Sequence, residues 1–211
     1  MALDTHEQEQ LDALKAWWQD NGTSILGIIL IVLASVGGWR GWEYYQNQQS
    51  IESATLFQQF IQQMDSGDVD RINDAAIAIR DKFSGSGYSP RAMLLASGVN
   101  EQNEDRIVAK GQLQWVIDNA SEEGLKDVAR LRMAALLLDE EQYAEAMQQL
   151  GGTHTPAFDG LYSDLKGDVL LAQGKTDEAR SSYNLAYEKL NDDSTYRAIV
   201  QMKMDALGIA K

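Results

Sequence analysis

The sequence predicts an all-α protein in which a single transmembrane helix near the N-terminus is followed by an array of helical hairpins. The stretch 21–39 contains no Asp, Glu, Lys or Arg. Beyond it, apolar residues recur every three or four positions, which is the period of an amphipathic helix. In the second half of the chain, similar segments recur at intervals of more than thirty residues, which is typical of stacked helical hairpins.

The uncharged stretch is long enough to cross a bilayer, because a helix over 21–39 would be roughly 28 Å long. Trp17 and Trp18 precede it, and Trp39 and Trp42 follow it. Amphipathic rings at both ends of an apolar helix are typical of the two membrane interfaces. A buried helix of a soluble core is the alternative, but no other part of the chain is apolar enough to surround it.

A cleaved signal peptide is a second alternative, and it would need a basic region before the apolar run. The residues before the run are mainly acidic, with Lys15 as the only basic side chain, and bulky Trp39 follows the run. The segment is therefore expected to remain in the mature protein. The expected organisation is an N-terminal tail over 1–22, a transmembrane helix over 23–42, a linker over 43–50 and a helical domain over 51–211.

The tail itself carries Leu11, Leu14 and Trp18 on one face of a short helix that we expect to end near Asn21 and Gly22. This face could lie in the membrane interface, could meet a partner, or could simply lead into the anchor.

Composition excludes several classes of function. The net charge of −14 argues against nucleic-acid binding, which needs a basic surface. The chain has no cysteine, so a disulfide, a cysteine-ligated zinc ion and a thiol nucleophile are all excluded.

The domain after the anchor begins with two predicted helices, one around Phe57 and Phe60 and one around Ile72 and Ile79. Loops are expected at 66–68 and 84–87, where Ser and Gly cluster. The chain has two prolines, in Ser89-Pro90 and Thr155-Pro156, and each pair is expected to start a helix with the hydroxyl residue as the cap.

Three degenerate repeats follow. Ala109, Ala146 and Ala179 are spaced 37 and then 33 residues apart, which brackets the 34-residue tetratricopeptide unit. A small residue lies twelve positions before each alanine, where it would let the two helices of a hairpin approach closely. The aromatic residue that the motif has near the start of its first helix is absent at Ser163. A final helix containing Tyr196 is expected to cap the stack. The predicted packing positions are Ser97, Ala109, Leu113, Ala134, Ala146, Leu150, Gly167, Ala179, Tyr183 and Ala186.

No catalytic, cofactor-binding or metal-binding residue is predicted. His6-Glu7 begins like a zinc-binding helix motif, but Gln10 occupies the place of the second histidine. His154 is interpreted as a solvated loop residue. The carboxylates around Asp68 lack the pattern of a calcium loop, so a helix cap is expected there. Acidic residues outnumber basic ones in the hairpins, which disfavours a clamp for C-terminal carboxylates and points to basic, apolar or mixed protein partners.

The Trp17-Trp18 pair with Asn21-Gly22, the glycine-bearing anchor that ends in Gly38-Trp39-Arg40, and the three degenerate hairpins together resemble the YfgM family of ancillary Sec translocon subunits. The resemblance covers nearly the whole chain. It implies a single-pass protein of the bacterial inner membrane, with a cytoplasmic N-terminus and a periplasmic C-terminal domain. Charge alone leaves this orientation undecided, because Lys15 and Arg40 balance each other across the anchor.

The resemblance also implies a non-enzymatic role and no cofactor. The implied partners are translocon subunits, a membrane-anchored periplasmic peptidyl-prolyl isomerase and exported polypeptides, which the protein would assist together with periplasmic chaperones. An anchored repeat scaffold for another envelope assembly machine is the alternative.

Overall fold

The computed structural model describes the backbone of residues 2–208 and the side chains of residues 8–208. The described residues form helices joined by short loops and include no strand, which confirms the predicted fold class. The side chains of His6 and Glu7 lie outside the described residues. The elements are α1 (Ala2–Met64), α2 (Val69–Lys82), α3 (Tyr88–Gln102), α4 (Arg106–Asn119), α5 (Glu123–Asp139), α6 (Tyr143–Leu150), the 3₁₀ turn η1 (Pro156–Phe158), α7 (Asp159–Ala172), α8 (Thr176–Lys189) and α9 (Thr195–Ala206).

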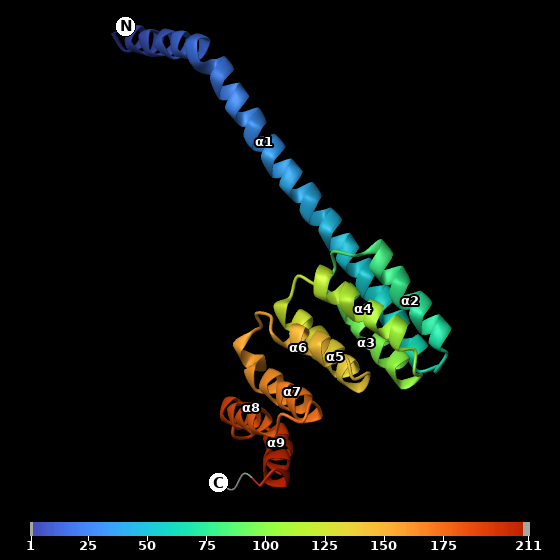
Figure 1. Ribbon diagram of the computed structural model, residues 1–211. Coiled ribbons are helices and arrows are strands. Elements are labelled where there is room, and N and C mark those ends of the chain that lie inside the picture. The colour runs from blue at the N-terminus through green and yellow to red at the C-terminus, as the bar shows by residue number, and fades with distance from the viewer. Residues whose placement is uncertain (1, 209–211) are drawn as a thin grey trace. The chain divides into compact units, whose positions relative to one another are not determined.

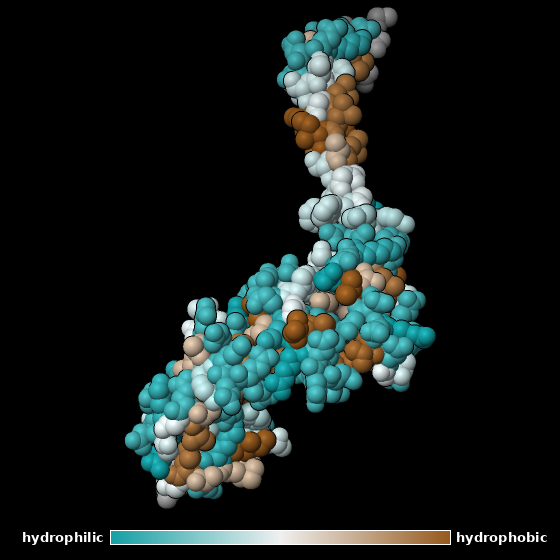
Figure 2. All heavy atoms as spheres, turned by 45° about the vertical axis from the view of Figure 1, so that its right-hand side comes forward, coloured by the Kyte–Doolittle hydropathy of each residue, from teal (hydrophilic) through white to brown (hydrophobic). Residues whose placement is uncertain are grey.

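The chain divides into two compact units, one up to Ile51 and one from Glu52 onward. The first unit consists of the part of α1 up to Ile51, and its apolar stretch is unburied, with Leu30 and Ile31 each more than 65% exposed. By length and composition this helix can cross a membrane. In Figure 2 the stretch is a continuous hydrophobic band with a hydrophilic end beside it.

The predicted helix end near Asn21 and Gly22 is wrong, since α1 continues through both residues. A single glycine costs a helix interior only about 1 kcal/mol, which the hydrogen bonds on either side offset. The Trp18 indole also covers the bare backbone, lying 3.1 Å from where a β-carbon of Gly22 would be. The ribbon bends in its N-terminal part but is not interrupted (Figure 1). The segment 43–50, expected as a linker, is likewise helical and part of α1.

In the second unit, successive helices pack against one another as antiparallel hairpins (Figure 1). The hairpins α3–α4, α5–α6 and α7–α8 follow in order, and the first helix of each also contacts the next, α3 with α5 and α5 with α7. Helix α9 packs on α8 and ends the series. This is the solenoid arrangement that the repeat spacing predicts.

Apolar side chains from these helices form two clusters. The larger cluster runs from Phe60 at the end of α1 to Val169 in α7. The smaller one joins Leu170 and the buried face of α8 to Val200 and Met204 of α9, so the last helix closes the end of the core. Burial of such side chains provides the main stabilisation, at about 1.5–3 kcal/mol for each large apolar residue.

Helix starts are capped only partly as the sequence predicts. Asp68 caps α2 by accepting a hydrogen bond from the Arg71 amide, as expected. The predicted cap at Ser89 is wrong: Gly87 precedes α3, and the Ser89 hydroxyl instead donates to the Ile79 and Phe83 carbonyls at the end of α2. It can do so because the tight loop before α3 brings it over that helix end, where the Ile79 and Phe83 carbonyls also accept backbone hydrogen bonds from Phe83 and Ser86.

Candidate protein-interaction site

The ten packing positions predicted from the repeats are all buried. Ser97, Ala134 and Gly167 lie on α3, α5 and α7, which are the first helices of the three hairpins. The alanines twelve residues later lie on the second helices, and each is fully buried. The small residues therefore sit where the two helices of a hairpin meet. The buried set is Ser97, Ala109, Leu113, Ala134, Ala146, Leu150, Gly167, Ala179, Tyr183 and Ala186.

One surface of the repeat array is formed by equivalent residues of α3, α5 and α7. Four residues after each small residue lie Glu101, Leu138 and Leu171, and all three are at least partly accessible. Five residues after it lie three exposed positions, which complete what we call the first-helix face. These are Gln102, Asp139 and Ala172.

The first-helix face contains apolar and acidic side chains. Close to it, Arg132 of α5 donates from Nη1 to the Leu94 carbonyl of α3 at 2.8 Å, which links these two helices. Burial raises the pKa of Glu101, and the positive charge of Arg132 opposes that shift. The buried Oε1 of Glu101 has no hydrogen-bond partner among the described residues. The face thus holds a partly buried carboxylate with one unpaired oxygen.

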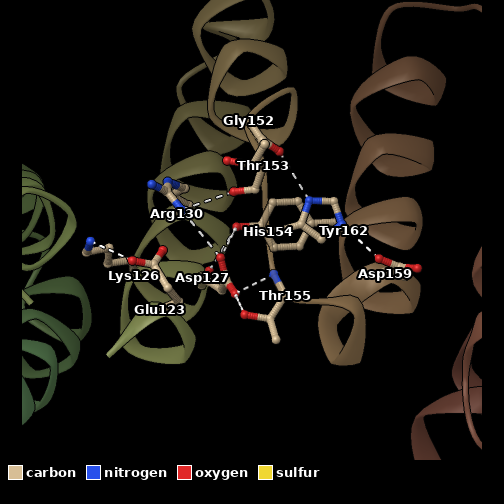
Figure 3. A network of polar contacts seen from close by, with 10 residues as sticks. All are labelled: Glu123, Lys126, Asp127, Arg130, Gly152, Thr153, His154, Thr155, Asp159 and Tyr162. Atoms are coloured by element: carbon tan, nitrogen blue, oxygen red, sulfur yellow. Dashed lines mark hydrogen bonds and ion pairs between the residues drawn. The ribbon is translucent and has the colours of Figure 1, made fainter. Parts of the chain in front are cut away.

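A second feature is a polar network between α5 and the loop before α7 (Figure 3). The buried carboxylate of Asp127 accepts from the Thr155 amide at 2.9 Å and from the Thr155 hydroxyl at 2.6 Å. The Tyr162 hydroxyl donates to the Asp127 carbonyl at 3.3 Å. Burial and the Asp127 charge raise the pKa of Tyr162 to about 12. Thr155 therefore uses its side chain to tie the loop to α5 rather than to cap the following turn.

The interpretation of His154 as a solvated loop residue is wrong. Its ring stacks on Tyr162, with ring centroids 4.0 Å apart and planes 9° from parallel. Nε2 lies 3.1 Å from Asp159 Oδ1, and Nδ1 lies 3.2 Å from the Gly152 carbonyl (Figure 3). The loop folds back on α7, because Asp127 holds Thr155 immediately after the histidine.

A third network joins α7, α8 and α9. Lys203 Nζ lies 2.8 Å from both Asp164 Oδ2 and Asp168 Oδ2. Tyr196 donates to Asp164, and Tyr183 donates to Asp168. Burial and these hydrogen bonds raise the pKa of both phenols, so they remain neutral donors.

A fourth cluster consists of neutral amides. Asn100, which is fully buried, donates to Asn73 at 2.8 Å and to Gln112 at 2.9 Å. It thereby links α2, α3 and α4.

The sequence did not predict the buried polar residues Asp127, Asp164 and Asn100 of these networks. The signal available was a polar residue inside an apolar helix face, such as Asp164 between Leu161 and Leu165. That signal does not say which distant residue completes the pair.

The four interface tryptophans predicted from the sequence lie on the first unit, and all are about half exposed or more. Trp39 is 73% exposed and Trp18 is 49% exposed. The other two, Trp17 and Trp42, are 52% and 62% exposed. The ring centroids of Trp42 and Tyr45 lie 6.4 Å apart.

The charged networks join helices and loops of the repeat domain to one another. Among the described side chains, no group of three or more His, Asp or Glu is placed to bind one. The buried acids Asp127 and Asp164 each have hydrogen-bond donors from other helices or loops.

These features define an α-helical repeat protein that carries one exposed apolar helix. A family model described as a tetratricopeptide repeat-like domain matches residues 15–209, and the chain belongs to that family.

Relatives that match over their full length are named "Ancillary SecYEG translocon subunit". The protein from Neisseria gonorrhoeae is 30% identical over 98% of this chain and 100% of its own length. Those from Aggregatibacter actinomycetemcomitans and Escherichia coli are 26% and 27% identical over 98% and 99% of this chain, each across its full length. They confirm the resemblance inferred from the sequence. The comparison with solved structures found no match.

Proposed function

We propose that this protein is a membrane-anchored, non-enzymatic interaction subunit of the Sec translocon that assists exported proteins together with periplasmic chaperones. The observation that carries the proposal is the full-length match to relatives named as ancillary SecYEG translocon subunits. The apolar helix and the repeat domain supply the two parts that such a subunit needs.

The apolar helix would hold the repeat domain at the membrane surface. A tethered domain meets nearby chains at a high effective concentration, so weak contacts suffice. We propose that the N-terminal tail is cytoplasmic and that the repeat domain is periplasmic, where translocon subunits, a membrane-anchored peptidyl-prolyl isomerase and emerging polypeptides are the partners. The first-helix face, with its apolar and acidic groups, suits basic and apolar segments of such partners.

Site-directed photo-crosslinking in cells tests the partner. A crosslinker at Gln102 or Ala172 samples the first-helix face, and one at Ile107, which is 83% exposed on α4, is the matched control. The proposal expects translocon or chaperone subunits from Gln102 and Ala172 and few from Ile107. Recovery of only cell-wall or appendage assembly proteins would instead favour an anchored scaffold for another envelope machine.

A variant of the anchor tests the tether. Leu30→Arg with Leu33→Arg places two charges in the apolar stretch, at about 2.5–3.5 kcal/mol each in a bilayer centre. This variant should be extracted by alkaline carbonate and should lose the crosslinks, whereas the native chain should resist extraction. A reporter that is active only outside the cytoplasm, fused after Lys211, tests orientation, and a silent fusion would refute the periplasmic placement.

A further inference from the structure

A pocket of about 260 Å³ lies between the loop before α7 and the helices α7 and α8. Its apolar part includes Leu150, at the end of α6, and Leu185 on α8, which is 45% exposed. The His154–Tyr162 stack forms a further wall (Figure 3). This wall is held in place, because both nitrogens of the His154 ring have hydrogen-bond partners.

The polar part of the pocket has unused hydrogen-bond donors. Lys166 and Ser163 line it from α7, three residues apart and so on one side of the helix. Among the described residues, Lys166 makes no ion pair and the Ser163 hydroxyl makes no hydrogen bond. The one acidic residue of the pocket, Asp159, already lies 3.5 Å from Lys189 and 3.1 Å from His154.

The local charge of the pocket is the opposite of the charge of the chain. The whole chain carries −14, yet the pocket presents one unpaired ammonium group beside an exposed leucine. Lys166 and Ser163 both line the pocket, and an ammonium and a hydroxyl are hydrogen-bond donors for a carboxylate.

The pocket is separate from the first-helix face. Successive residues of an α-helix are turned by about 100° from one another. Leu171 and Ala172 of the first-helix face follow Lys166 by five and six residues, which turns each of them by more than about 100° from Lys166 around α7. The pocket and the first-helix face can therefore be occupied at the same time.

We propose that this pocket binds an extended peptide segment in which a carboxylate lies next to an apolar side chain. Lys166 and Ser163 hold the carboxylate, and the surface around Leu150 and Leu185 receives the apolar group. The carboxylate comes either from the C-terminus of a partner chain or from an internal Asp or Glu. This site rests on the proposed protein-binding role but is independent of the identity of the membrane partner.

Fluorescence anisotropy of the full-length chain in detergent micelles tests the site with three rhodamine-labelled octapeptides of equal length. One has an internal Leu-Asp step and an amidated end, and one has a terminal Leu with a free carboxylate. The third has Leu-Asn in place of Leu-Asp and an amidated end. At least one carboxylate peptide should bind about fivefold more tightly than the neutral peptide. Which of the two does so identifies the source of the carboxylate.

Lys166→Gln should abolish this preference. Lys175→Gln, which removes the same charge at an exposed position between α7 and α8, should retain it. Leu185→Ser should weaken all three peptides while leaving the preference for carboxylate. Circular dichroism with unchanged thermal unfolding verifies that the variants fold.

The site is refuted if the neutral peptide binds as tightly as both carboxylate peptides, if Lys175→Gln has the same effect as Lys166→Gln, or if no peptide binds at millimolar concentration. The assay contains no translocon component. A negative result would refute peptide binding in this pocket and would leave the proposed role at the translocon to be tested by crosslinking.

Discussion

The ring of Tyr183 occupies the space that a side chain on Gly167 would need: a β-carbon at Gly167 would lie 2.5 Å from Cε1 of Tyr183. The tyrosine is fully buried, and its hydroxyl donates to Asp168 at 2.8 Å. It cannot move aside without breaking that bond. The hairpin α7–α8 therefore depends on the absence of a side chain at this position.

Gly167→Ala should destabilise the repeat domain by about 1–2 kcal/mol, because overpacking outweighs the better helix propensity of alanine. The matched control is Gly111→Ala on α4, where a β-carbon would have nothing within 4 Å. That change should be stabilising by up to about 1 kcal/mol. Urea unfolding followed by circular dichroism measures both, and equal effects of the two changes would contradict the close approach.

Lys203→Met should cost about 3 kcal/mol or more, because Asp164 is only 1% exposed and would lose its counter-charge. The loss should be concentrated in α9, so its amides should exchange faster with solvent than those of α3. Adding Asp164→Asn to this variant should recover part of the stability, since the uncompensated charge is removed. Absence of recovery in the double variant would indicate that Lys203 acts through packing alone.

Asp127→Ala should destabilise the loop before α7 by about 2–4 kcal/mol, because the Thr155 amide and hydroxyl both lose their acceptor. Asp127→Asn keeps one carbonyl oxygen and should cost less. Exposed Asp118 on α4 offers the control Asp118→Ala, which should change the free energy of unfolding by under about 0.5 kcal/mol. Limited proteolysis near Gly152 would report the released loop.

Glu101→Gln should raise the thermal midpoint at neutral pH by about 1–3 °C, because a partly buried carboxylate with an unpaired oxygen becomes neutral. Burial raises the pKa of Glu101 in the folded chain. The folded state therefore binds this proton more tightly than the unfolded state does. The ionisation penalty sets in as pH rises from the unfolded pKa and is complete above the folded pKa.

The advantage of Glu101→Gln should accordingly shrink as pH falls through the raised pKa, where Glu101 is protonated and neutral. Glu188→Gln, at an exposed position of α8, is the control and should show no such pH dependence. Thermal unfolding between pH 4 and pH 8 makes the comparison. An advantage that stays constant with pH would refute the ionisation of Glu101 as its cause.

The sequence by itself was enough to predict the fold class, the apolar helix and the repeat register. Uncharged length and helical periodicity are local properties, and the alanines of the repeats recur at fixed spacing, so Ala109, Ala146 and Ala179 could be aligned without a structure. The same local signals were misleading at Gly22 and Ser89. At Gly22 the helix continues and the Trp18 indole covers the bare backbone. At Ser89 the loop before α3 places the hydroxyl on the end of α2 instead of on the start of α3.

Only the tertiary structure decided which polar groups are paired. His154 reads as a loop residue because nothing nearby in the chain identifies Tyr162 as its stacking partner, and Lys203 meets Asp164 across 39 residues. The pocket beside Lys166 likewise combines a loop with two helices. Hydrophobic periodicity determines which face of each helix is buried, whereas the pairing of charges and hydroxyls depends on how those faces are brought together in space.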